Sequence, residues 1–169
     1  MFDKQIRLYG RHADILKKYS KDKQGENEMH FDVDNNEGTK KTIYIFDNML
    51  QCYMVAAMLG INNKKKANLD TDKNTYATIF ADVLIKNRSN LMRIYSHMIL
   101  SSDSNEDVDS KIKKAFSINS SDADANQEEL DSYVRGGLEI IDDTFSKCAS
   151  YEDVSNSILD LLDGIELGD

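Results

Sequence analysis

The segment DNMLQCYMVAAMLG, residues 47–60, is the strongest core candidate in this chain of 169 residues. Asp47 can cap the start of a helix, and Gly60 is placed to end it. Between them, apolar side chains cover nearly the whole helical circumference, which predicts a helix with neighbours on all sides. At about a dozen residues, the helix is too short to cross a bilayer. The segment therefore predicts a helical fold built around one apolar helix.

Further helices are indicated by apolar residues at helical spacing on both sides of this segment. We expect them over residues 11–19, 75–100, 108–116, 130–148 and 153–165. Asn87 and Arg88 interrupt the apolar stripe of the longest one. Capping boxes at Ser104–Asp107 and Ser150–Asp153 precede the helix that starts near 108 and the last helix. The chain contains no proline, the residue that most often breaks helices.

The remaining residues predict short strands and polar connections. Surface loops are expected over residues 20–41 and 119–126. Residues 42–45 predict a β-type segment. Residues 5–9 predict either a short strand or the first turn of a helix, which Gly10 interrupts. The sequence thus predicts a mainly α protein, a single compact multi-helix bundle over residues 1–169, with a small two-stranded ribbon near the amino terminus.

The charge of the chain limits its partners. Thirty acidic residues against 21 basic ones give a formal net charge of −9, which repels phosphate backbones and anionic membranes. Only two cysteines occur, and the first nine residues lack the apolar run of a signal peptide. We therefore expect a cytoplasmic protein that does not bind membranes and binds nucleic acid weakly or not at all.

One local concentration of positive charge opposes this trend. Lys64, Lys65 and Lys66 are consecutive, and Arg88 and Arg93 follow on the next long helix. The residues are interpreted either as a solvated surface or as a contact site for nucleic acid or for an acidic partner.

Two stretches partly match a calcium-binding loop. In residues 32–38 the glycine comes one position late and Ile43 stands where the closing acidic ligand belongs, whereas residues 70–74 contain neither glycine nor closing glutamate. Solvated loops explain both better, and no nucleotide, zinc or nucleophile motif is present. We expect no cofactor and no metal.

Helical ribonucleases of the HEPN type carry an arginine and a histidine a few residues apart on a helix. Arg7 and His12 have this order, but Leu8 replaces the usual polar residue and Gly10 weakens the helix. Arg93 and His97 are one residue too close. The sequence therefore favours a protein that is not an enzyme.

Three stretches together resemble a known family: IRLYGRHADIL (6–16), IFDNMLQCYMVAAMLGI (45–61) and SYVRGGLEII (132–141). Small bacterial proteins encoded beside DNA phosphorothioation (Dnd-type) genes and related phage-defence cassettes share an aromatic residue that opens a helix ending in Ala-Ala-x-x-Gly. They also share a later Tyr-x-x-Gly-Gly-Leu. Here these motifs are Phe46, Ala56, Ala57 and Gly60, followed by Tyr133, Gly136, Gly137 and Leu138. The resemblance implies an accessory role in DNA modification or defence.

The glycine pair also has a physical interpretation. Each glycine inside a helix costs about 1 kcal/mol relative to alanine, so Gly136 and Gly137 predict the close approach of another helix, from this chain or from a partner.

The leading hypothesis is a non-enzymatic adaptor or regulatory subunit that binds a co-encoded protein, such as a basic DNA-handling protein, through electrostatic complementarity. Two alternatives stay open. One is a small DNA-binding regulator that uses the basic region 64–93, and the other is a HEPN-like ribonuclease.

Overall fold

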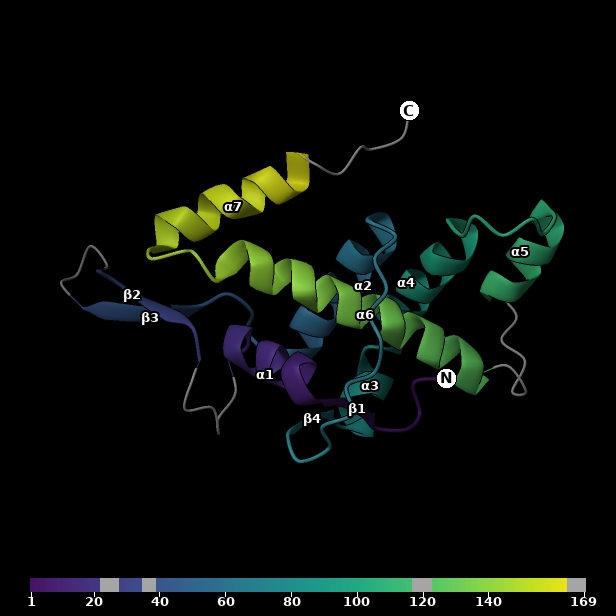
Figure 1. Ribbon diagram of the computed structural model, residues 1–169, viewed down its shortest axis with the longest axis horizontal. Helices are drawn as coiled ribbons and strands as arrows, with labels where there is room; N and C mark the ends of the chain where they lie inside the picture. Colours follow the sequence, from purple (N-terminus) through teal and green to yellow (C-terminus); the bar gives the residue numbers. More distant parts are fainter. Residues whose placement is uncertain (22–27, 35–38, 117–122, 164–169) are drawn as a thin grey trace.

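The computed structural model describes residues 1–21, 28–34, 39–116 and 123–163 (Figure 1). In this part of the chain, seven helices and four short strands confirm the predicted mainly α fold. The helices are α1 (Gly10–Tyr19), α2 (Met49–Asn62), α3 (Ala81–Lys86), α4 (Arg88–Leu100), α5 (Val108–Phe116), α6 (Ala123–Phe145) and α7 (Tyr151–Asp163). The strands are β1 (Ile6–Tyr9), β2 (His30–Asp34), β3 (Lys40–Tyr44) and β4 (Tyr76–Ile79).

The strands form two antiparallel ribbons where one was expected. β1 pairs with β4, with Ile6 opposite Ile79, and β2 pairs with β3, with His30 opposite Tyr44. The prediction of a surface loop over residues 20–41 is therefore wrong in its described part. Backbone N–H and C=O groups form such a ladder whatever the polarity of the side chains, so a polar composition did not exclude it.

Helix α2 is the predicted apolar helix, with differences at both ends. Asn48 and not Asp47 caps it, because Asn48 Oδ1 accepts a hydrogen bond from the backbone N–H of Gln51 (2.9 Å). The helix also continues past Gly60, so the prediction that Gly60 ends it is wrong. Gly60 lies inside the helix, where the backbone of Tyr133 on α6 comes too close to leave room for a side chain.

The single helix predicted over residues 75–100 is wrong, because this stretch forms β4, α3 and α4. The first part pairs with β1, and its aromatic and β-branched residues suit a strand. The two helices meet at Asn87, whose Nδ2 donates a hydrogen bond to the carbonyl oxygen of Val83 (2.9 Å). This break coincides with the interruption of the apolar stripe.

Helix α5 begins at its predicted start, whereas α6 begins earlier than predicted. Asp107 accepts a hydrogen bond from the backbone N–H of Ser110 (3.0 Å), so Asp107, and not Ser104, caps α5. Helix α6 starts at Ala123, inside the range that was expected to be a loop. The start of that range, up to residue 122, lies outside the described residues.

The capping box ahead of α7 is confirmed. Ser150 Oγ accepts a hydrogen bond from the backbone N–H of Asp153 (3.1 Å), and the Asp153 carboxylate accepts one from that of Ser150 (2.9 Å). The described part of α7 ends at Asp163, so its predicted end at Ile165 lies outside the described residues.

The core lies where α2 crosses α6, with α1 and α4 packed on either side of the crossing (Figure 1). Tyr19, Tyr53, Tyr95 and Leu138 are fully buried there. No described helix combines the length and the apolar character that crossing a membrane requires.

Candidate protein-docking groove

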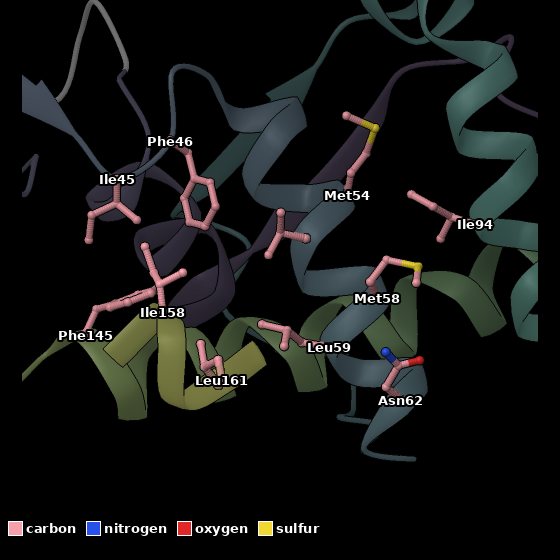
Figure 2. A pocket seen from close by; sticks show the side chains of 11 residues that line it. Ile45, Phe46, Met54, Met58, Leu59, Asn62, Ile94, Phe145, Ile158 and Leu161 are labelled. Carbon is pink, nitrogen blue, oxygen red and sulfur yellow. The ribbon is translucent and has the colours of Figure 1, made fainter. Parts of the chain in front are cut away.

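An apolar groove of about 450 Å³ runs along one face of α2 (Figure 2). Helix α2 provides the floor, α7 and α4 the two banks, and the segment before α2 one end. The groove is lined by Ile45, Phe46, Met54, Val55, Met58, Leu59, Asn62, Ile94, Phe145, Ile158 and Leu161. All but Asn62 are apolar, so the groove suits an apolar ligand of the size that protein pockets usually bind.

Among the described residues no element covers this face of α2, which leaves the groove open. Ala56 faces α6, whereas Met58 comes two residues later, about 200° round the helix. Helix α2 contains no charged residue, yet Val55 is 40% exposed, as is Ile158 on the α7 bank. A contiguous apolar surface of this kind typically marks an interaction site. Two methionines in the floor add a flexible surface that adapts to different side chains.

The α7 bank is acidic and lightly anchored. The helix contains four acidic residues and no basic one: Glu152, Asp153, Asp160 and Asp163. Among its described side chains only Val154 is fully buried, and Leu159 on another side of the helix is 58% exposed. Asp160 comes two positions after Ile158, about 200° round the helix, so the acidic side of α7 faces away from the groove. Helix α7 has little packing of its own to lose when a ligand contacts it.

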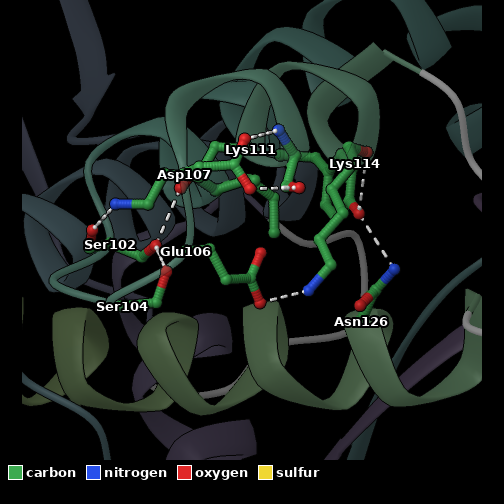
Figure 3. Close-up of polar contacts among 10 residues, drawn as sticks. Ser102, Ser104, Glu106, Asp107, Lys111, Lys114 and Asn126 are labelled. Carbon is green, nitrogen blue, oxygen red and sulfur yellow. Dashed lines mark hydrogen bonds and ion pairs between the residues drawn. The ribbon is translucent and has the colours of Figure 1, made fainter.

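Helix α5 turns its large apolar side chains to solvent. Three side chains at helical spacing are 70%, 45% and 69% exposed, namely Val108, Ile112 and Phe116. Polar contacts hold the other side of α5: Ser96 Oγ donates a hydrogen bond to the carbonyl oxygen of Ala115 (2.9 Å), and Lys111 donates one to that of Ser102 (Figure 3). Because these contacts fix the helix, its apolar stripe is a surface and not a misplaced core face.

The family-like motif lies at the crossing of α2 and α6. A side chain on Gly137 would collide with the carbonyl oxygen of Ala56, and one on Gly136 with that of Lys65. Leu138 is fully buried, and Tyr133 stacks under Lys66, whose Nζ lies 4.6 Å from the ring centre. The close helix approach predicted from the glycines is confirmed, and it occurs within this chain.

A polar cluster lies beside the same crossing. Tyr53 Oη donates a hydrogen bond to Asp131 Oδ1 (2.6 Å), and Gln127 Nε2 donates to both groups (3.1 Å to Asp131 and 3.2 Å to Tyr53). Burial raises the pKa of Asp131 to about 6. The buried Arg135 bonds Glu128 (2.7 Å) and the carbonyl oxygen of Ala67 (2.9 Å). These polar groups form hydrogen bonds with one another or with neighbouring groups of this chain, and none of them is a nucleophile that faces an open site.

The three lysines of the predicted basic patch are each paired with acidic side chains of this chain. The distances are 2.6 Å from Lys64 to Asp103, 3.3 Å from Lys65 to Glu139 and 2.8 Å from Lys66 to Glu129. Arg88 and Arg93 are exposed on α4, but Arg88 begins that helix while Asp103, the partner of Lys64, follows its end. About 18 Å of helix separates the two ends. The structure does not gather the five residues into one patch.

The structure separates Arg7 from His12 and keeps Arg93 and His97 on one helix. Arg7 lies on β1 against the ring of Tyr76, whereas His12 is buried, its pKa is lowered by burial, and its Nε2 lies 3.5 Å from Glu139. Arg93 is exposed. His97 Nε2 lies 2.9 Å from Asn62 Oδ1, within hydrogen-bonding distance. Arg93 and His97 lie one turn apart on α4, and neither of them lines the described groove.

The described aspartates of the two partial calcium loops have structural roles, and residues 35–38 of the first loop lie outside the described residues. Asp32 on β2 accepts a hydrogen bond from Thr42 on β3 (2.8 Å). Asp70 accepts one from the backbone N–H of Arg11 (3.0 Å) at the start of α1. Among the described residues no three His, Cys, Asp or Glu side chains are arranged to hold a metal ion.

The groove was not predicted from the sequence. A helix that is apolar all round indicates neighbours on every side, and the pattern cannot tell which neighbour is missing. The stripe of α5 carried the signal of a core-facing helix, and only the position of α5 shows that it faces solvent. The absence of basic residues from the last helix was the one visible sign of the acidic bank.

Comparison with known proteins places this chain in a family. The family model described as DNA sulphur modification system-associated protein 4 matches residues 27–164. Of the three stretches that resemble the Dnd-associated proteins, the second and third lie inside this match, and 6–16 precedes it. No curated protein and no solved structure matches the chain. Because the match covers most of the sequence and both motifs, the chain belongs to the family of DNA sulphur modification system-associated protein 4.

Proposed function

We propose that this protein is a non-enzymatic accessory subunit of a DNA sulphur modification system, and that it binds an apolar, basic helix of a co-encoded protein in the groove on α2. The observation that carries the proposal is the groove itself, an apolar surface on an uncharged core helix that lies open beside an acidic helix. Family membership supports the association with the modification system.

The shape of the groove favours a helix as its ligand. The floor runs from Met54 to Asn62, about 12 Å along α2, and α4 and α7 form its sides. This is the arrangement in which an amphipathic helix binds, with apolar residues at positions i, i+3 or i+4, and i+7 pointing into the groove. An extended peptide would need an unpaired strand edge, which the lining elements do not provide.

The charges favour a basic ligand. The chain carries a formal net charge of −9, so long-range attraction favours lysines or arginines beside the apolar face of the ligand helix. A protein that handles DNA commonly has such basic segments. Direct DNA binding by this chain has less support, because its consecutive lysines are already paired with Asp103, Glu139 and Glu129.

Two neighbouring residues on α7 give a matched test. Ile158 lines the groove, whereas Leu159 does not, and both are exposed enough to be replaced without opening the core. We expect Ile158→Glu to weaken binding to the co-encoded partner by at least about tenfold and Leu159→Glu to leave it unchanged. Titration calorimetry with each co-encoded protein measures this. Equal affinity for both variants, or no binding by the wild type, would exclude the proposed docking site.

The absence of enzymatic activity is tested separately. We expect the purified chain to leave duplex DNA, single-stranded DNA and RNA intact, with or without divalent metal. Cleavage that is lost in His97→Ala would replace the adaptor proposal by the ribonuclease hypothesis.

A further inference from the structure

Helix α5 and the turn before it carry no net charge, although the whole chain carries −9. Residues 106–116 contain three acidic and three basic side chains, namely Glu106, Asp107, Asp109, Lys111, Lys113 and Lys114. Two copies of this acidic chain therefore repel each other less where α5 faces α5 than their net charge implies. The same helix presents the exposed apolar stripe of Val108, Ile112 and Phe116, which no element in the described part of the chain covers. It lies at one end of the molecule (Figure 1).

We propose that two copies of this chain associate through α5, with the two helices antiparallel about a twofold axis and their apolar stripes in contact. Ile112 of each copy then lies near the axis, and Val108 of one copy lies beside Phe116 of the other. A contact of this kind uses the same patch on both copies, so it closes at two and gives a dimer. The surface is separate from the groove on α2, and the proposal goes beyond the proposed function.

The charged side chains beside the stripe favour the antiparallel arrangement. Asp109 and Lys113 are exposed on the same edge of the stripe, and neither forms an ion pair among the described residues. In an antiparallel pair the same edges of the two helices meet, so Asp109 of one copy faces Lys113 of the other. With Ile112 opposite its own copy, the two positions differ by about 3 Å along the helix, a distance that a lysine side chain spans. The twofold axis makes this ion pair twice.

A parallel pair has less support. In that arrangement the edge with Asp109 and Lys113 would meet the other edge of the second helix, which is formed by Lys111 and Ala115. Ala115 is fully buried against its own chain, and Lys111 donates a hydrogen bond to the carbonyl oxygen of Ser102. Because that edge packs on the rest of its own chain, it is not free to meet a second copy.

The size of the surface sets the strength of the contact. Helix α5 has nine residues, so a single pair of these helices buries less surface than stable complexes bury. The dimer is therefore weak and reversible, and it forms at high protein concentration.

Sedimentation velocity over a range of concentrations tests the contact. We expect the wild type to dimerise as its concentration rises into the millimolar range, and Phe116→Glu and Val108→Glu to stay monomeric. Leu159→Glu is the control, because Leu159 is an exposed apolar residue on α7, and it should dimerise as the wild type does. Circular dichroism of each variant checks folding. A wild type that stays monomeric up to millimolar concentration, or dimers that persist in both stripe variants, would overturn the proposal.

Two charge reversals test the antiparallel arrangement itself. Asp109→Lys brings two lysines together at each of the two ion pairs, and Lys113→Glu brings two carboxylates together there. Each variant alone should therefore dimerise at least about tenfold more weakly than the wild type. In an equimolar mixture of the two variants, opposite charges face each other again at both pairs, so a heterodimer should form with about the affinity of the wild type. A mixture that dimerises no better than the separate variants would reject the antiparallel contact.

The proposal and the proposed function fail in different experiments. Ile158→Glu changes the groove and should still dimerise, whereas Phe116→Glu leaves the groove intact and should bind the co-encoded protein as the wild type does. If the wild type stays monomeric and Phe116→Glu loses the co-encoded protein, the stripe binds that protein and not a second copy. Dimerisation without binding to any co-encoded protein would support this proposal and reject the proposed function.

Discussion

Replacing Asp131 by asparagine should change how the stability of this protein depends on pH. Asp131 accepts hydrogen bonds from Tyr53 and Gln127 at the crossing of α2 and α6, and burial raises its pKa to about 6. Asparagine keeps an acceptor oxygen for Tyr53 but does not titrate. A comparison of the two proteins therefore isolates the cost of holding this carboxylate charged inside the fold.

The sign and size follow from the two pKa values. In an unfolded chain an aspartate titrates near pH 4, so the folded protein binds the proton more tightly. The stabilisation from that proton is fully present below about pH 4 and is lost as the pH rises through about 6. A shift of about two units corresponds to about 3 kcal/mol, of which about 2 kcal/mol falls between about pH 4.5 and 7.5. Over this range Asp131→Asn should gain about that much stability relative to the wild type.

Urea unfolding followed by circular dichroism at several pH values measures this difference. Asp160→Asn is the control, because Asp160 is exposed on α7, and its stability should follow the wild type at every pH. If Asp131→Asn also follows the wild type across the whole range, Asp131 is not held in a costly charged state and the argument from burial is wrong.

Three further predictions concern the helix crossing and the lysines. In urea titrations, Gly137→Ala should lower the free energy of unfolding by at least about 1 kcal/mol, because the new methyl group meets the backbone of Ala56. The better helix propensity of alanine should not offset this clash. Leu138→Ala should cost about 2 to 5 kcal/mol in the same assay, whereas Leu159→Ala at its exposed site should change stability by less than about 0.5 kcal/mol. Fluorescence anisotropy at about 0.15 M salt should show weak duplex DNA binding that changes less than about twofold when Lys64, Lys65 and Lys66 become glutamate, since these lysines are already paired.

The sequence predicts those parts of the fold that depend on strong local signals. The apolar helix α2 and the Ser150–Asp153 capping box appear where their residues indicate, and the glycine pair predicted a close helix neighbour. Each of these signals reflects a local physical requirement, such as a cap for free N–H groups or space for a crossing backbone.

The missed features depend on distant parts of the chain. The apolar residues of the stretch 75–100 have helical spacing, yet Tyr76–Ile79 at its start pair with β1, some seventy residues earlier in the sequence. Here long-range strand pairing overrides the local preference. The lysines looked free because their acidic partners lie 39 to 74 positions later in the sequence. Side chains that are far apart in sequence can only be paired once the fold is known.

The family-like motif and the candidate groove lie on different faces of α2, so the residues that fix the fold and those that line the groove can be changed separately. Gly137 lets α6 lie against Ala56, which fixes the position and tilt of α2. Met58 faces the other way, into the groove, so the motif positions the groove floor without contributing to its lining. A change at the motif should therefore impair the fold and every interaction together. A change at Ile158 should impair docking alone, because that side chain touches the groove and lies outside the crossing.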